Sequence, residues 1–262
     1  MRTLLFIHGW ATDNFVWEGA AKALGGDKNI LNLSLPGHGG REKWDEPTLS
    51  PAIKELSSRL SALEDNSIIG VGWSLGAEVL VASFGSLKKK FGGLVLVGAT
   101  PCFVEKEDFP WGQSRVLVKR MILDMKKDPA STVNRFYGLN FTGTELNTVG
   151  AGRFIERYGY PGPLDCTTAV PGCFPVFKYD EITTALEALY LTDIRGALSL
   201  IDTPTLIVHG GKDGVTPAGA GRYLADKING AELKVFKEAG HAPFVTEPQR
   251  FNEAVKDFME RL

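Results

Sequence analysis

The sequence predicts an α/β fold, with a mostly parallel sheet flanked by helices. Short apolar runs, such as residues 67–72 and 92–98, alternate with stretches whose apolar residues recur at helical spacing. Near-continuous apolar strands are typical of parallel sheets that are covered on both faces. The first such run, residues 3–8, comes at once and ends in His-Gly.

The other elements follow the same alternation. Residues 53, 56, 60 and 63 are apolar and share one face of a helix expected over 51–63. Further helices are expected at 15–24, 77–84, 218–227 and 248–261. Further strands are expected at 29–33, 205–209 and 232–236.

The alternation stops between residues 103 and 189, where no clear strand is found. Residues 113–127 have the apolar pattern of an amphipathic helix, while residues 159–175 are rich in Gly and Pro and are expected to form a loop. We therefore predict a core made of residues 1–104 and 190–262, with a helical cap inserted at 105–189. An insertion at this point would lie over the carboxyl ends of the strands, where α/β sheets bind ligands.

The composition is that of an ordinary globular protein. Apolar residues make up 44% and charged residues 23% of the chain, and the net charge of −2 gives no overall positive field to attract nucleic acid or an acidic membrane. No apolar run approaches the ~18 residues that a membrane span needs, and the N-terminus lacks a signal-peptide pattern. We expect a soluble, cytoplasmic monomer that binds neither nucleic acid nor membrane.

The cysteines give no indication of a metal site. Cys102, Cys166 and Cys173 form no CxxC pair, and an odd count without a secretion signal favours free thiols. Their spacing is not that of metal ligands, and neither GxxxxGK[ST] nor HExxH is present. We expect neither a metal nor a cofactor.

The segment Gly72-Trp73-Ser74-Leu75-Gly76 matches the pattern G-x-S-x-G. In this motif a serine occupies a strained turn from a strand into a helix, and the flanking glycines allow strand and helix to pass close together. The expected strand before the motif and helix after it provide that context. Ser74 is therefore the predicted nucleophile, and the alternative is a plain glycine-rich turn.

A serine hydroxyl needs an adjacent base to act as a nucleophile. In proteins with this motif an acid and then a histidine follow the serine along the chain. His241, in a loop after the strand expected at 232–236, is the predicted base, whereas His209 ends a strand with no plausible acid ahead of it. Asp213 follows the strand expected at 205–209 and is predicted to bind the imidazole and select its tautomer.

Acyl transfer passes through an oxyanion that backbone N–H groups stabilise. The N–H of Leu75, directly after the serine, is one predicted donor, and the N–H of Trp10, after the first strand, is the other. The Trp10 ring would also form a wall of the substrate pocket, unless it packs as an ordinary core residue. His8, at the end of that strand, is predicted to be structural.

With these residues, the chain resembles the α/β-hydrolase family along nearly its whole length. It looks most like the pimeloyl-[acyl-carrier protein] methyl ester esterases of biotin synthesis. The more specific motifs are HGW at 8–10, GWSLG at 72–76 and HAPF at 241–244. Weaker ones are TPCF at 100–103, RF at 135–136, GTE at 143–145 and DG at 213–214.

The resemblance implies a carboxylesterase that hydrolyses the methyl ester of a pimeloyl chain carried by acyl carrier protein. It implies an acyl-enzyme on Ser74 and no cofactor. In that family the stretch matched here by Phe136 to Asn140 contacts the substrate, and cap arginines bind the acidic carrier protein. Of the residues here, Arg135 falls on such an arginine position.

The predicted cap is also basic in itself. Residues 113–160 hold eight Lys or Arg and four acids, a local charge of +4 (8 − 4). Such a surface steers an acidic partner and raises its association rate at low salt. Lys119, Arg120 and Arg135 are the candidate partner-binding residues, and the alternative is a solvated helix face.

The chain departs from the family pattern in two places. Most members have one or two strands before the His-Gly loop, and without that hairpin the sheet would have an exposed edge. Residues 159–175 do not follow the family's cap pattern.

Two other functions are compatible with the motifs: a general small-ester or carbon–carbon-bond hydrolase of the same fold, and a non-catalytic ligand receptor on a hydrolase scaffold.

Overall fold

The computed structural model describes residues 2–39, 42–159 and 178–262, which contain one sheet of six strands. The strands are β1 (Thr3–Ile7), β2 (Asn29–Leu33), β3 (Ile68–Trp73), β4 (Phe91–Val97), β5 (Thr205–Gly210) and β6 (Glu232–Phe236). Their order is β2-β1-β3-β4-β5-β6, and every neighbouring pair is parallel. All carboxyl ends therefore meet at one edge of the sheet, and the predicted fold class is confirmed.

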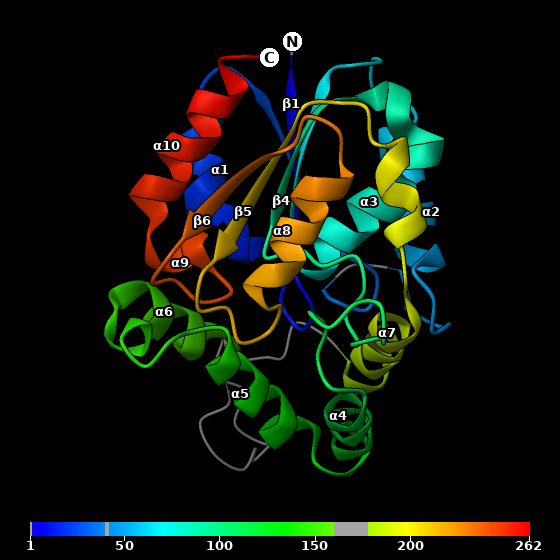
Figure 1. The fold of residues 1–262 in the computed structure, drawn as a ribbon, viewed down its shortest axis with the longest axis vertical. Helices are drawn as coiled ribbons and strands as arrows, with labels where there is room; N and C mark the ends of the chain where they lie inside the picture. The colour runs from blue at the N-terminus through cyan, green and yellow to red at the C-terminus, as the bar shows by residue number, and fades with distance from the viewer. Residues whose placement is uncertain (1, 40–41, 160–177) are drawn as a thin grey trace.

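Helices cover both faces of the sheet (Figure 1). On one face lie α1 (Glu18–Gly25), preceded by the 3-10 turn η1 (Asn14–Trp17), and α10 (Pro248–Met259). On the other lie α2 (Ser50–Leu60), α3 (Leu75–Leu87), which is followed by η2 (Lys88–Lys90), and α8 (Ala218–Lys227). In α10, Phe251, Ala254, Val255 and Phe258 are buried at positions of one helical face, which explains why this segment packs as a helix on the sheet.

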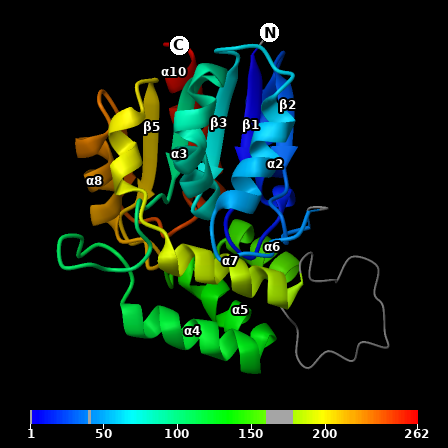
Figure 2. The same cartoon turned by 90° about the vertical axis from the view of Figure 1, so that its right-hand side faces the viewer.

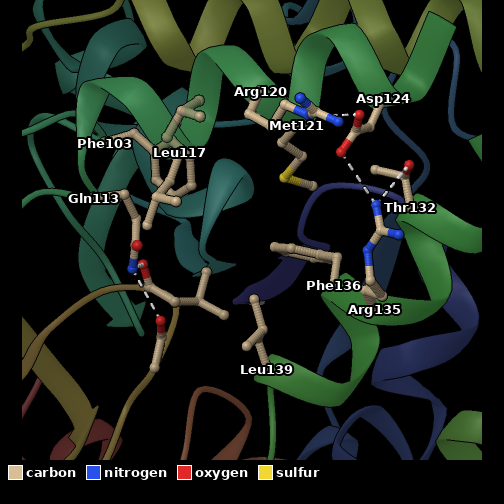
Figure 3. Close-up of a pocket in the computed structure, with 13 residues that line it drawn as sticks. Phe103, Gln113, Leu117, Arg120, Met121, Asp124, Thr132, Arg135, Phe136 and Leu139 are labelled. Carbon is tan, nitrogen blue, oxygen red and sulfur yellow. Dashed lines mark hydrogen bonds and ion pairs between the residues drawn. The ribbon is translucent and has the colours of Figure 1, made fainter. Parts of the chain in front are cut away.

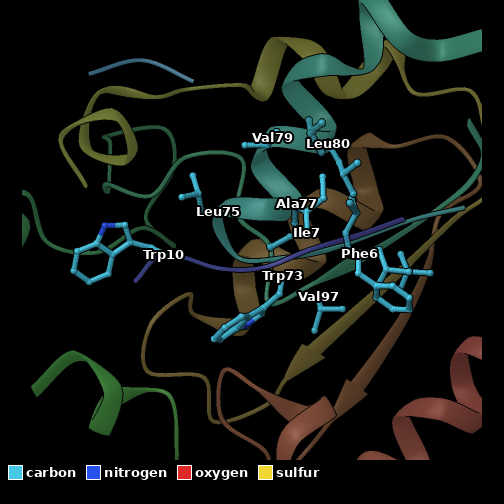
Figure 4. Packing of buried hydrophobic residues seen from close by; sticks show 14 of the residues in the cluster. Phe6, Ile7, Trp10, Trp73, Leu75, Ala77, Val79, Leu80 and Val97 are labelled. Carbon is cyan, nitrogen blue, oxygen red and sulfur yellow. The ribbon is translucent and has the colours of Figure 1, made fainter. Parts of the chain in front are cut away.

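The central strands of the sheet are enclosed on both faces. Every residue of β3 is buried, and Figure 4 shows Trp73 and Val97 on one side of the sheet and Leu80, from α3, on the other. The edge strand β2 differs, because Asn29 and Ile30 are exposed. The exposed edge expected from the sequence is therefore present in the described sheet.

Between β4 and β5 the chain forms the helices α4 (Arg115–Lys127), α5 (Pro129–Leu139), α6 (Val149–Tyr158) and α7 (Tyr179–Leu191), with the short turn η3 (Glu145–Asn147) between α5 and α6. We call α4–α7 with η3 the cap. Figures 1 and 2 show it beyond the carboxyl ends of the strands. The turn η4 (Arg195–Leu200) then leads into β5, and α9 (Pro243–Thr246) lies between β6 and α10.

Two predicted helices need correction. The helix expected at 77–84 starts at Leu75, because the turn at Ser74 passes directly into the helix. The helix expected at 15–24 is divided into η1 and α1. The limit between cap and core, predicted between residues 189 and 190, stays a prediction; α7 spans these two residues, and its last bond runs from Thr192 N–H to Ala188 O. The loop expected at 159–175 lies, after Gly159, outside the described residues.

Within the described ranges, no helix combines the length and the apolar character needed to cross a bilayer.

Candidate active site

Ser74 occupies the turn between β3 and α3 with φ 52° and ψ −117°. A positive φ is strained for a residue with a side chain, so the surrounding structure must impose it. A Cβ atom at Gly72 would lie 2.7 Å from the main chain of Ala77, and one at Gly76 would overlap the carbonyl oxygen of Ile7. The two glycines of the motif are therefore required by the close passage of strand and helix, as the sequence predicts.

Asp213 and His241 form a buried pair. Oδ2 of Asp213 accepts a hydrogen bond from Nδ1 of His241 at 2.8 Å, and neither side chain is exposed. Oδ1 accepts the N–H groups of Val215 and Thr216, each at 2.8 Å. Burial alone would raise the pKa of Asp213, but the neighbouring His241 and these hydrogen bonds lower it overall, so the carboxylate is ionised and oriented.

The imidazole of His241 lies at the carboxyl end of the central strands. The Trp73 indole N–H donates to the His241 carbonyl oxygen at 3.0 Å, and a Cβ atom at Gly98 would lie 2.9 Å from the imidazole. Gly98 follows Val97, whose carbonyl accepts the N–H of Ser74 at 2.9 Å. Ser74 therefore lies at the end of β3, and the imidazole of His241, from the loop after β6, lies at the end of the adjacent strand β4.

Nε2 of His241 is the nitrogen that would act as the base. It is buried and has no hydrogen-bond partner among the described residues, so no hydrogen bond joins it to the Ser74 hydroxyl. Catalytic hydrogen bonds of this type often shorten only when substrate is bound. The structure thus brings Asp213 and His241 into direct contact, whereas Ser74, after β3, makes no hydrogen bond to either of them among the described residues.

The imidazole of His209, which was not among the predicted site residues, lies next to Asp213. Nε2 of His209 is 2.7 Å from the carbonyl oxygen of Thr216 and 3.4 Å from Oδ2 of Asp213. The prediction that no acid precedes His209 in the chain is unaffected, because Asp213 follows His209 by four residues, and that spacing is the sequence signal for their contact. Burial lowers the pKa of His209, so it is neutral and donates to Thr216.

The two predicted oxyanion donors lie at the ends of the adjacent strands β1 and β3. Leu75 is the first residue of α3, so its N–H has no acceptor within the helix. The N–H of Trp10 has no hydrogen-bond acceptor in the part of the chain that the structure describes. The Trp10 ring is buried, donates through Nε1 to Ile182 O of α7 at 2.7 Å, and meets Phe136 edge to face at 4.8 Å between centroids.

His8 has the structural role that the sequence predicts. Its Nε2 accepts the N–H of Leu35 at 2.9 Å, and its Nδ1 lies 2.8 Å from Gly9 O. Burial lowers its pKa to about 4, so it is neutral near pH 7. It holds the loop that carries Trp10 against the loop after β2.

A cavity of about 350 Å³ lies between α4, α5 and the loop after Asp213 (Figure 3). Its apolar walls include Phe103, Leu117, Val118, Met121, Phe136, Leu139 and Val215. Arg120 and Arg135 also line it, and each is paired with Asp124, at 2.9 and 3.3 Å. Lys119 is exposed and lies 6.0 Å from the ring of Tyr190.

Phe136 lines this cavity, but Asn140 does not. Asn140 is fully buried, and its side-chain amide donates to the carbonyl oxygens of Phe136 and Tyr137. Its own carbonyl accepts the N–H of His241 at 2.8 Å. Asn140 therefore supports the loop of His241 and does not line the cavity, which differs from its predicted place in the substrate pocket.

The described residues contain no group of three or more His, Cys, Asp or Glu side chains arranged to hold a metal ion. Cys102 is a buried free thiol, and Cys166 and Cys173 lie outside the described residues.

Residues 4–254 match the model of the alpha/beta hydrolase family. Together with the fold and the turn at Ser74, this match shows that the chain belongs to the alpha/beta hydrolase family.

The curated proteins similar to this chain include several that are named pimeloyl-[acyl-carrier protein] methyl ester esterase. It is 30% identical over 251 residues to the one from Nitrosomonas europaea, covering 95% of this chain and 92% of that protein. It is 30% identical over 261 residues to the one from Aromatoleum aromaticum, covering 97% and 96%. The predicted resemblance to these esterases is confirmed.

Solved structures show the same fold. An esterase from Exiguobacterium antarcticum superposes with a TM-score of 0.83 at 22% identity, covering 99% of this chain and 92% of that chain. The enol-lactonase from Burkholderia xenovorans LB400 superposes with a TM-score of 0.81 at 17% identity, covering 99% and 91%. At these identities the likeness shows the fold alone, so the site must indicate the chemistry.

Proposed function

We propose that this protein is a serine carboxylesterase that hydrolyses the methyl ester of a pimeloyl chain carried by acyl carrier protein. The observation that carries the proposal is the buried Asp213–His241 pair, with Nε2 of the imidazole unbound beside the strained turn of Ser74. Two relatives at 30% identity over almost the whole chain carry the name of this activity, and they support the choice of substrate.

The mechanism follows from the residue types. The Ser74 hydroxyl attacks the ester carbonyl while Nε2 of His241 takes its proton, and Asp213 stabilises the imidazolium. The N–H groups of Leu75 and Trp10 stabilise the oxyanion, and loss of one such donor costs about 3 kcal/mol. The imidazolium then protonates the departing methoxide, and methanol leaves an acyl-enzyme. Water, deprotonated by His241, attacks this acyl group and releases the carboxylate and the free serine.

The acyl chain is proposed to lie in the cavity of Figure 3. Its apolar walls suit a row of methylenes, each of which contributes about 0.8 kcal/mol on burial. Phe136 would form the part of the wall nearest the oxyanion donors, because its ring contacts Trp10 edge to face; the Trp10 ring is itself buried and does not line the cavity. We take the cap to be the unit that supplies this cavity, with its limits at about residues 105 and 191.

The carrier protein is proposed to bind over Lys119, Arg120 and Arg135. The side chains of Arg120 and Arg135 are 69% and 62% exposed, so their pairing with Asp124 is a weak surface interaction that leaves both free to contact an acidic partner. Arg120 and Arg135 line the cavity in which the acyl chain is proposed to lie. A carrier protein bound to them would therefore lie close to the end of the acyl chain that is attached to it. Attraction between such surfaces acts mainly on the association rate and weakens with salt.

The first test compares pimeloyl-carrier methyl ester with a short p-nitrophenyl ester as substrates. We expect a much higher kcat/KM for the carrier-linked ester, and complementation of a biotin-requiring strain that Ser74→Ala abolishes. Equal kcat/KM values would indicate a general small-ester hydrolase. Ligand binding without turnover, and without a stable organophosphonate adduct at Ser74, would indicate a non-catalytic receptor.

The second test reverses the charge at Lys119, Arg120 and Arg135 together, each to Glu. We expect kcat/KM for the carrier-linked ester to fall far more than for the p-nitrophenyl ester, with the difference shrinking at high salt. The matched control carries the same three charge reversals at Lys22, Lys237 and Lys256, which are exposed on the core. Equal effects of the two triple variants would exclude the cap as the docking surface.

A further inference from the structure

Glu145, in the turn η3 of the cap, is a buried carboxylate outside the catalytic pair. Its Oε2 accepts the N–H of Gly240 at 2.8 Å and the N–H of Thr142 at 2.8 Å. Its Oε1 accepts the hydroxyl of Thr246 at 2.6 Å. Gly240 directly precedes His241 and Thr246 ends α9 five residues later, so one carboxylate binds the chain on both sides of the catalytic base.

A second cap contact holds the base itself. The carbonyl oxygen of Asn140 accepts the N–H of His241 at 2.8 Å. A Cβ atom at Gly240 would lie 2.6 Å from that same oxygen and 2.9 Å from Oε2 of Glu145, so only glycine permits this approach. On its other side, the Gly240 carbonyl lies so close to Gly210 that a Cβ there would overlap it. The loop before His241 is therefore enclosed between the cap and the end of β5.

We propose that Glu145 is a positioning residue for His241. The carboxylate fixes the main chain of the base loop, so that the imidazole stays aligned with Asp213, and it makes the alignment depend on the cap being packed on the core. Glu145 has no contact with the reacting atoms in this role. The inference rests on the proposed serine-hydrolase function, and it does not depend on which ester is the substrate.

The alternative is that Glu145 only stabilises the cap. The two roles predict different kinetics. A displaced base lowers kcat, because a shift of about 1 Å in a catalytic group can reduce the rate about a hundredfold. A loosened cap would instead weaken substrate binding and raise KM. The division of the effect between kcat and KM therefore distinguishes them.

The experiment measures kcat and KM on a p-nitrophenyl ester, and the rate at which an organophosphonate labels Ser74, for Glu145→Ala and Glu145→Gln. Glu145→Ala removes all three hydrogen bonds; we expect kcat and the labelling rate to fall about tenfold to a hundredfold, with KM within about twofold of the wild type. In Glu145→Gln the amide oxygen can still accept the two N–H groups and the NH2 group can donate to the Thr246 hydroxyl. This variant should retain kcat within about threefold.

Two further variants complete the design. Glu156→Ala removes an exposed glutamate of α6 and should behave as the wild type. Thr246→Val removes one anchor and leaves the Gly240 bond, so kcat should fall about threefold with KM unchanged. If Glu145→Ala does not fold, Thr246→Val tests the positioning role instead. An unchanged kcat in Thr246→Val would then overturn the inference.

Other outcomes separate the inference from the proposed function. An unchanged kcat in Glu145→Ala, an effect confined to KM, or equal losses in Glu145→Ala and Glu145→Gln would overturn the positioning role. A wild type that turns over the p-nitrophenyl ester but not the carrier-linked ester would overturn only the proposed substrate. A wild type that neither hydrolyses the p-nitrophenyl ester nor takes up the phosphonate would overturn both.

Discussion

Nδ1 of His241 donates to Oδ2 of Asp213 at 2.8 Å, although 28 residues separate them in the chain. The two residues lie in the loops after β5 and β6, which are neighbouring parallel strands. Both loops therefore leave the sheet at the same edge. Because Oδ1 is occupied by two backbone N–H groups, Oδ2 is the oxygen that faces the imidazole.

This arrangement predicts the effect of Asp213→Asn. The amide oxygen can keep the bonds to the N–H groups of Val215 and Thr216, but the NH2 group then faces Nδ1 of His241. The imidazole must carry its proton on Nε2 and can no longer accept one from Ser74. We expect kcat on a p-nitrophenyl ester to fall about 10³- to 10⁴-fold, measured by steady-state kinetics. Asp202→Asn, an exposed control, should leave kcat unchanged; a loss below about tenfold in Asp213→Asn would contradict the assignment.

The hydroxyl of Thr216 contacts the carboxylate of Asp213 and helps to hold it in place. This hydroxyl lies 2.9 Å from Oδ2 of Asp213 and 3.0 Å from the carbonyl oxygen of Gly98. Thr216→Val keeps the shape but removes this group, and we expect a loss of about 1 kcal/mol in the free energy of unfolding and about tenfold in kcat. Thr216→Ser retains the hydroxyl and should recover most of both losses. Denaturant titration and kinetics on the same preparations test this, and equal behaviour of the two variants would refute it.

Phe136 limits the size of the cavity. It is buried and lines the wall next to Trp10. Phe136→Ala should enlarge the cavity and move the preference toward longer acyl chains, with a loss of about 3 kcal/mol in the free energy of unfolding. Relative kcat/KM values over p-nitrophenyl esters of increasing chain length measure the shift. Leu146→Ala, on η3 and half exposed, is the control, and the same chain-length profile in both variants would count against this placement of the substrate.

Buried neutral histidines make the stability of the fold depend on pH. Burial lowers the pKa of His8 from 6.5 to about 4 and that of His38 to about 3. Between these values and pH 6.5 the unfolded chain binds protons that the folded chain does not, so stability falls as pH falls through this range. For His8 alone the loss reaches about 3 kcal/mol once the pH is below its folded-state pKa.

Urea unfolding at about pH 7 and about pH 5 tests this dependence. The wild type should be clearly less stable at the lower pH. His8→Gln has no titrating group, so the difference between the two pH values should shrink by about 2 kcal/mol. An unchanged difference in His8→Gln would show that His8 is protonated in the folded state at the lower pH.

The strand positions and the residues of the candidate site could be predicted from the sequence. Parallel strands buried on both faces require continuous apolar runs, and the turn at Ser74 requires glycines two residues before and after it. Asp213 and His241 could be found because each follows a recognisable strand, and the ends of parallel strands meet at one edge. These features are local, because each can be recognised from residues within a few positions of one another.

The tertiary structure alone decided what holds those residues in place. Glu145 contacts Gly240 across 95 positions, and Asn140 turns its side chain away from the cavity and its carbonyl toward His241. His209, which the sequence set aside, lies behind Asp213. No periodicity or motif spacing encodes the contacts of Glu145 and Asn140, because they depend on how the cap packs on the loops of the core. Apolar patterning determined which elements form and which faces they bury, whereas the contacts between loops were set only when those faces came together.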